Sequence, residues 1–127
     1  MADSDIYRTV LPAGSITASG TTGPIHVTSD ASAAGVDVVI DLTGFTGGTA
    51  PSITFSAAWD ADADSATYPP AAWGAPVSTA ALTAAGRTVL HLAPTVGPKG
   101  TVPCYLQVSW TVAGAPTSVD HTGIFVS

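Results

Sequence analysis

The sequence predicts an all-β domain, built as an antiparallel β-sandwich of the jelly-roll or immunoglobulin-like kind, with about seven or eight strands and at most one short helix. Three observations predict this class. Runs in which apolar and polar residues alternate recur along the chain. Gly and Pro separate these runs at the short intervals typical of sandwiches. Glu is absent and Lys occurs once, so the chain lacks the residues that amphipathic surface helices usually use. The length of 127 residues suits one domain, and we expect residues 1–127 to form it.

The N-terminal segment supports two interpretations. Pro12 and Gly14 break two short apolar runs, residues 7–11 and 15–18. These runs predict either a short strand pair at a sheet edge or an extended N-terminal arm over residues 1–18. Because an edge strand invites strand addition by a partner, the two interpretations predict similar contact surfaces.

Three segments alternate over their whole length and predict the main strands. They are residues 36–42, 52–59 and 105–112. Apolar side chains occupy every second position in each, so one face of the strand is expected in the core and the other in solvent. The Gly and Pro residues within 44–51 predict a turn or hairpin connection between the first two strands.

The remaining segments are shorter or less regular. Residues 60–76 contain three Asp and three Pro without periodicity and predict the longest loop, where function often resides. Residues 80–85 are the one place where a helix is allowed. A last strand at 118–126 is expected to complete a C-terminal hairpin. We also expect loops at 20–24 and 94–103, strands at 25–28 and 88–92, and a strand or a helical turn at 77–82.

Charge excludes several classes of partner. The chain contains nine Asp and three cationic residues, which gives a formal net charge of −6. Three cations cannot neutralise a run of phosphates or hold an anionic membrane surface, so we expect neither nucleic acid nor a membrane as a partner. Asp3 and Asp5 stand where a signal peptide carries Lys or Arg, and no apolar run is long enough to span a membrane. We expect synthesis in the cytoplasm without an export signal.

No motif in the sequence predicts catalysis. The chain contains no Gly-x-Ser-x-Gly elbow, no Gly-Lys-Ser/Thr phosphate loop and no paired metal-ligand motif. Cys104 is the single cysteine and lies in a strand-like run, which predicts a buried, inert thiol. His26, His91 and His121 could form a metal site only if their strands were neighbours, and an exposed or hydrogen-bonded role is expected for each. We predict no enzymatic activity and no cofactor.

The sharpest local signal lies at the start of the long loop. Asp60, Asp62 and Asp64 alternate, and alternating carboxylates can converge on Ca²⁺. The pattern departs from an EF-hand, because Ser65 and Ala71 stand where that loop needs Gly and Glu. A solvated acidic loop is therefore favoured over a calcium site.

The same loop carries aromatic residues. Tyr68 and Trp73, with Trp59 just before the loop, could form a platform for a sugar or an anchor for a partner protein. The alternative is that they cap one end of the core.

Several β-rich segments resemble small structural proteins of tailed bacteriophages, especially phages of actinobacteria. The resemblance covers most of the chain from about residue 15 onward and implies a virion protein of the β-sandwich kind, without catalytic residues. Residues 60–76 match no part of it. The segments are 35–43 followed by Gly47, 51–55, Gly86–Leu92 followed by Pro94, 105–110, and the closing run to Ser127.

The resemblance implies a capsid decoration or minor capsid protein that binds and stabilises the assembled head. Its partners would be the major capsid protein or other virion proteins and further copies of this chain, with a trimer favoured, and its location would be the capsid surface of the virion. The alternatives are a minor tail or head-tail connector protein and, from another class, a calcium- or carbohydrate-binding module that uses the long loop. Candidate contact residues are Ile6, Tyr7, Val10, Leu11, Tyr68 and Trp73.

Overall fold

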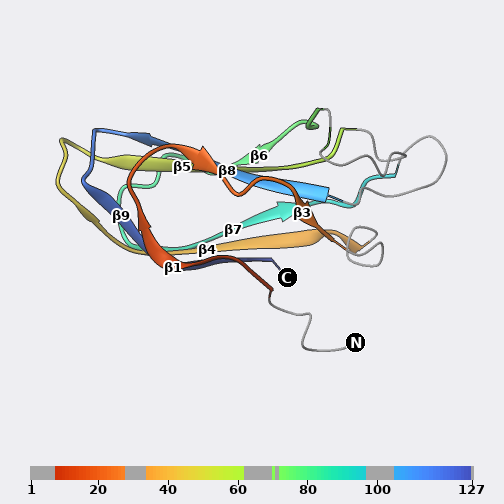
Figure 1. Cartoon of the computed structure of the whole chain (residues 1–127), viewed down its shortest axis with the longest axis horizontal. Helices are drawn as coiled ribbons and strands as arrows, with labels where there is room; N and C mark the ends of the chain where they lie inside the picture. The colour runs from red at the N-terminus through yellow and green to blue at the C-terminus, as the bar shows by residue number, and fades with distance from the viewer. Residues whose placement is uncertain (1–7, 28–33, 62–69, 71, 97–104, 127) are drawn as a thin grey trace.

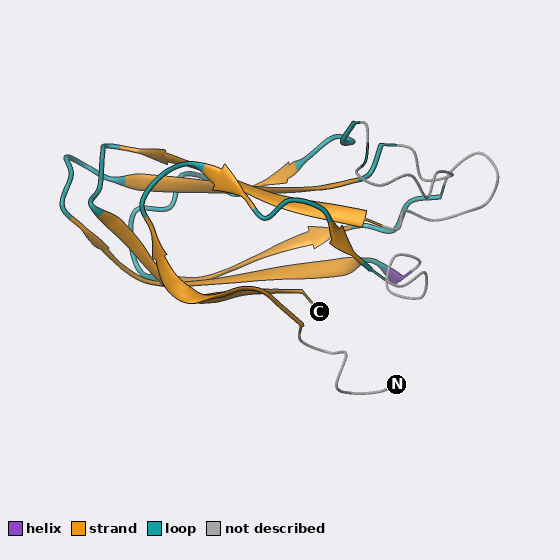
Figure 2. Ribbon diagram, viewed as in Figure 1, coloured by secondary structure: helices purple, strands orange, loops and turns teal. Residues whose placement is uncertain are grey.

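The computed structural model describes residues 8–27, 34–61, 70, 72–96 and 105–126. These residues form two antiparallel β-sheets that pack face to face, with strands making up most of the described chain (Figures 1 and 2). Sheet A, the lower layer in Figure 1, contains in order β1 (Arg8–Ile16), β9 (Ser118–Val126), β4 (Val36–Thr46) and β7 (Gly86–Leu92). Sheet B contains in order β2 (Gly20–Thr21), β8 (Tyr105–Ala113), β5 (Ser52–Trp59) and β6 (Val77–Ser78), and β3 (Ile25–His26) also pairs with β8.

The strand order is that of a jelly roll. The chain starts in sheet A with β1, crosses to sheet B for β2 and β3, returns for β4, crosses again for β5 and β6, and then alternates through β7, β8 and β9. Every neighbouring pair is antiparallel. This arrangement confirms the predicted all-β sandwich and selects the jelly roll over the immunoglobulin-like alternative.

The long strands lie where alternation predicted them. In β4 the side chains of Val36, Val38, Ile40 and Leu42 are buried, as expected for one face of a half-buried strand. Both sheets contribute to a single core. Its largest fully buried side chains are Phe55, Ile40, Ile53, Leu92, Leu106 and Ile124.

One helix that the sequence allowed does not form, and one local prediction was wrong. No helix forms at 80–85, because Leu82 is held in an extended bridge to Ile53 by two backbone hydrogen bonds, 3.0 Å from Ile53 N to Leu82 O and 2.8 Å in the reverse direction. The loop expected at 20–24 begins with the short strand β2, whose residues Gly20 and Thr21 pair with β8. In both cases pairing with a neighbouring strand decides the backbone conformation, and local composition does not show such pairing.

The connection at 44–51, predicted as a turn or hairpin, and the predicted C-terminal hairpin are both arches that join different sheets. The β4–β5 connection crosses from sheet A to sheet B, and the β8–β9 connection crosses back, side by side at the left end of Figure 1. The arches are bonded to each other: Thr49 N donates to Gly114 O at 2.9 Å and Thr117 N donates to Thr46 O at 2.7 Å. Turn composition predicted both reversals, but it does not distinguish a hairpin from an arch.

Strand β1 runs without a break through Pro12 and Gly14. Among the described residues it is the outermost strand of sheet A and pairs only with β9. An edge strand tolerates a Pro because its outer side makes no ladder with another described strand. A shift of register between Thr9 and Leu11 marks a bulge. Residues 8–16 are therefore an edge strand of the domain, and residues 1–7 of the proposed arm lie outside the described residues.

Candidate functional site

A groove opens beside β1, on the side of the sandwich where the edge of sheet A faces β8 of sheet B. Its volume is about 280 Å³. Most of the residues that line it are apolar, and Ser15, Thr17 and His121 are the polar ones. The lining residues are Leu11, Pro12, Gly14, Ser15, Ile16, Thr17, Ala18, Trp110 and His121.

The segment after β1 closes one end of the groove and is fixed to sheet B by side chains. Trp110 donates its indole N–H to the Ala18 carbonyl oxygen at 3.0 Å, and the backbone N–H of Val112 donates to the Ser19 hydroxyl at 2.9 Å. Gly20 lies against the indole, where a Cβ atom would meet the ring at 3.4 Å. Figure 1 shows the chain rising from β1 to the upper sheet in this region. These contacts fix the position of the 17–19 segment relative to the Trp110 ring.

His121 enters the groove from sheet A. It lies in β9 opposite Gly14 of β1 on one side and Leu42 of β4 on the other, next to a bulge in the β4–β9 ladder. Because β9 places Val119 and His121 two residues apart, both side chains turn toward the core. The residue is 5% exposed. Its Nδ1 is the one buried side-chain nitrogen or oxygen without a hydrogen-bond partner among the described residues.

Burial controls the protonation of this imidazole. Desolvation lowers the pKa of His121 below its ordinary value, and the neighbouring Asp120 carboxylate opposes the shift without reversing it. Asp120 itself accepts a hydrogen bond from the Ser15 hydroxyl at 2.6 Å. The ring is therefore neutral at pH 7, with one N–H donor and one acceptor nitrogen.

The N-terminal contact candidates fall in or before β1. Leu11 is half-buried and packs against the core, where it also lines the groove. Val10 lies in β1 at the shift of register. Ile6 and Tyr7 lie outside the described residues.

The candidates in the long loop are only partly described. Asp60 is buried at the end of β5, where its backbone N–H donates to the Tyr105 carbonyl oxygen at 3.0 Å and its backbone pairs with Trp73. Trp73 is half-buried in that bridge. Asp62, Asp64 and Tyr68 lie outside the described residues, as does Cys104.

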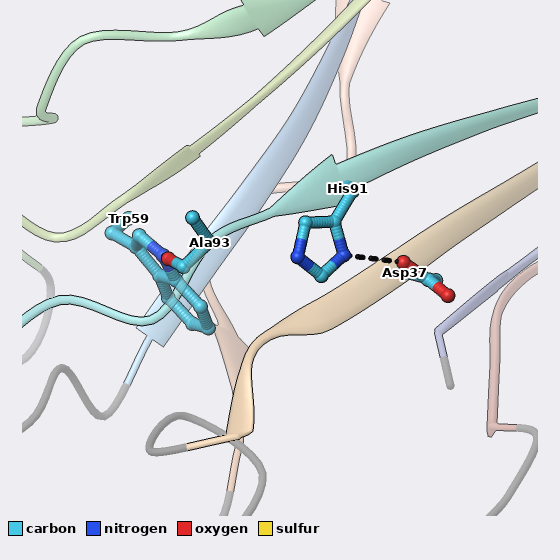
Figure 3. A network of polar contacts seen from close by, with 4 residues as sticks. All are labelled: Asp37, Trp59, His91 and Ala93. Atoms are coloured by element: carbon cyan, nitrogen blue, oxygen red, sulfur yellow. Dashed lines mark hydrogen bonds and ion pairs between the residues drawn. The ribbon is translucent and has the colours of Figure 1, made fainter.

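Trp59 belongs to the core and does not extend the loop platform. It is 8% exposed, and its indole N–H donates to the Ala93 carbonyl oxygen at 2.9 Å (Figure 3). The backbone N–H of Gly74 in turn donates to the Trp59 carbonyl oxygen at 2.8 Å. For this residue the structure bears out the core-capping alternative.

The three histidines occupy separate places. His26 is exposed on β3 in sheet B and meets Tyr105 edge to face, with ring centroids 5.5 Å apart. His91 is exposed on β7 and lies 2.7 Å from an Asp37 carboxylate oxygen, the dashed contact in Figure 3. Only His121 is interior, and the expectation of an exposed or hydrogen-bonded histidine was wrong there. Within the described ranges no group of three or more His, Cys, Asp or Glu side chains could hold a metal ion.

No family model, no curated protein and no solved structure matches the chain. In the part of the chain that the structure describes, no helix is long and apolar enough to cross a membrane.

Sequence reasoning missed the groove, although one signal for it was present. The alternation of Val119 and His121 in the last strand places the imidazole on the core side. The approach of Trp110 to the 17–19 segment was not predictable, because it joins residues more than 90 positions apart, as the separation of 92 between Ala18 and Trp110 shows.

Proposed function

We propose that this chain is a non-enzymatic structural protein of a tailed-phage virion, which binds the assembled head as a decoration or minor capsid protein. The jelly-roll topology supports the proposal, because viral capsid domains use it, as do lectin domains and cupins. Since a fold alone does not imply a function, the resemblance of the β-rich segments to phage structural proteins is the needed second support. The partners are the major capsid protein and further copies of this chain, with a trimer as the favoured assembly.

The observation that carries the proposal is the position of β1. It is a nine-residue strand at the edge of sheet A, and its middle residues Pro12, Ala13 and Ser15 are exposed. An edge strand offers backbone groups on its outer side to a partner strand or loop. A protein that binds at a fixed position on the capsid needs such a contact surface and does not need a catalytic site.

Cosedimentation with capsids that lack this protein tests the proposal. Deleting residues 1–18 is a poor test, because it removes β1 together with the buried Ile16 and exposes β9. We would instead compare the full chain with a variant that lacks residues 1–7 and with Ala13→Arg, which places a bulky charge at the edge. Thr83→Arg, an exposed position in the β6–β7 connection, is the matched control.

Saturable binding that is lost in Ala13→Arg and kept in Thr83→Arg would support a capsid contact through β1. Binding lost only on deletion of residues 1–7 would assign the contact to the segment before β1. A full-length chain that does not bind capsids would overturn the decoration hypothesis, and binding to isolated tails would favour the tail or connector alternative.

A further inference from the structure

The groove beside β1 is lined by His121, a buried imidazole whose Nδ1 has no hydrogen-bond partner among the described residues. A buried polar atom without a hydrogen bond destabilises the fold, and such atoms in native proteins usually have a partner from the protein, from water or from a ligand. Nδ1 has none among the described residues. Since His121 lines the groove, the groove is the side from which a ligand can reach the imidazole, directly or after a turn of the ring.

Either ring nitrogen can serve a ligand in the groove. Nδ1 is buried without a partner in the conformation described, and His121 lines the groove. A half-turn of the ring about its Cβ–Cγ bond exchanges Nδ1 with Cδ2 and Nε2 with Cε1, which changes the ring atoms that face the groove. In the neutral ring one nitrogen donates and the other accepts, and the tautomer decides which. A hydroxyl group, which both donates and accepts, satisfies either arrangement.

The charge of the site selects a neutral ligand. None of the nine lining residues carries a charged side chain, and the imidazole is neutral at pH 7. The nearest carboxylate, that of Asp120, is engaged with the Ser15 hydroxyl. A charged ligand would lose its hydration without gaining an opposite charge, which is costly.

The walls select a ligand that is apolar on one side and hydroxylated on the other. Leu11, Ile16 and Trp110 offer carbon surface, while Thr17 and His121 are polar residues beside them. The Ser15 hydroxyl is engaged with Asp120. The volume of about 280 Å³ equals that of about nine liquid waters, which suits one small ring and not a drug-sized molecule.

We propose that the groove between β1 and β8 binds one neutral sugar ring, with its carbon face against Leu11, Ile16 and Trp110 and a hydroxyl group on His121. This site is separate from the 60–76 loop that the sequence suggested for sugars. The proposal goes beyond the virion function and does not depend on it. Because one small ring makes few contacts, affinities of about 1 mM or weaker are expected.

The test is a titration of the ¹⁵N-labelled full chain, followed by amide and imidazole nitrogen shifts. The probes are glucose, galactose, mannose and N-acetylglucosamine, each added separately, with the cation glucosamine and the anion glucuronate as charged comparisons. We expect saturable shifts at residues 14–18, Trp110 and His121 with at least one neutral sugar, and none with the charged pair.

Two variants and one control make the result specific. His121→Phe keeps a ring in place but removes both nitrogens, and Ala18→Leu narrows the groove at an exposed position without touching the imidazole. Both should abolish the shifts, while His91→Phe, on exposed β7, should keep them. If His121→Phe does not fold, Ala18→Leu decides alone. Absence of saturable shifts with every neutral sugar, or shifts that persist in the folded groove variants, would overturn the proposal and leave water as the partner of His121.

Discussion

The imidazole of His121 is placed where its charged form is unfavourable. Burial lowers the pKa of His121, and the opposing effect of Asp120 is smaller. In the unfolded chain the imidazole titrates near its ordinary pKa of about 6.5. As the pH falls through that value, the unfolded state takes up a proton that the folded state does not, so the free energy of unfolding decreases. We expect this contribution to be complete above about pH 6.5 and to be lost progressively until the pH falls below the folded pKa.

Urea unfolding at several pH values between about 7.5 and 5.5 measures this effect. The wild-type chain and the His26→Gln control, which changes an exposed histidine, should both lose stability on acidification. His121→Phe should show a flatter profile, because it has no group at this position to protonate. An equally steep loss in His121→Phe would assign the pH dependence to another residue.

Residue-scale prediction from the sequence succeeded where periodicity alone decides the environment. Val36, Val38 and Ile40 are buried as alternation predicts. His121 obeys the same alternation, yet residue type suggested exposure or a hydrogen bond, and in this case periodicity was the better guide. The bulges beside it could not be predicted, because they arise from the register between strands distant in the sequence.

At the scale of elements, the two stacked arches depend on glycine. Gly114 has φ of +80°, and a Cβ atom there would lie 2.6 Å from Thr49 O and 2.7 Å from Pro51 Cα, both backbone atoms of the other arch. Gly114→Ala combines a left-handed conformation with a clash that no side-chain rotation relieves. We expect a loss of about 3 kcal/mol in the free energy of unfolding.

Gly23→Ala is the matched control, since Gly23 has a similar φ of +74° but nothing within 4 Å of the added Cβ. Its cost should be about 1 kcal/mol, from the backbone conformation alone. Denaturant midpoints of the two variants compare the effects directly. Equal losses would mean that contact between the arches contributes nothing beyond the φ preference.

The long strands of this jelly roll and the turns between them could be predicted from the sequence, but the sheet to which each strand belongs could not. Alternation located the long strands, and Gly and Pro located the reversals between them. Turn composition predicted a turn or hairpin for the first arch and a hairpin for the second, because it reports that the chain reverses and not which sheet receives the next strand. The short strands β2 and β6, two residues each, lack any period and exist only through pairing with β8 and β5.

For the whole molecule, the two ends of the described chain meet in one sheet. Ser15 and Asp120 are 105 positions apart, yet β1 pairs with β9 along its length. β9 in turn lies between β1 and β4, which makes the last described strand a central one. Sheet A is therefore incomplete until nearly all of the chain is present, a long-range topology typical of slow folding.

This topology predicts unequal effects of shortening the chain at its two ends. Removing residues 118–127 takes Val119, Ile124 and Val126 out of the core and separates β1 from β4. Burying each such side chain contributes about 1.5–3 kcal/mol, so together they approach the total of about 5–15 kcal/mol that stabilises an ordinary domain. The shortened chain should be unfolded, with a collapsed amide spectrum and no cooperative melting.

Removing residues 1–7, before β1 begins, should leave the dispersed spectrum and the melting transition in place, because every strand of both sheets is retained. A cooperative transition in the chain without β9 would show that the remaining strands form a stable sandwich without the central strand of sheet A, contrary to the role that the topology gives it.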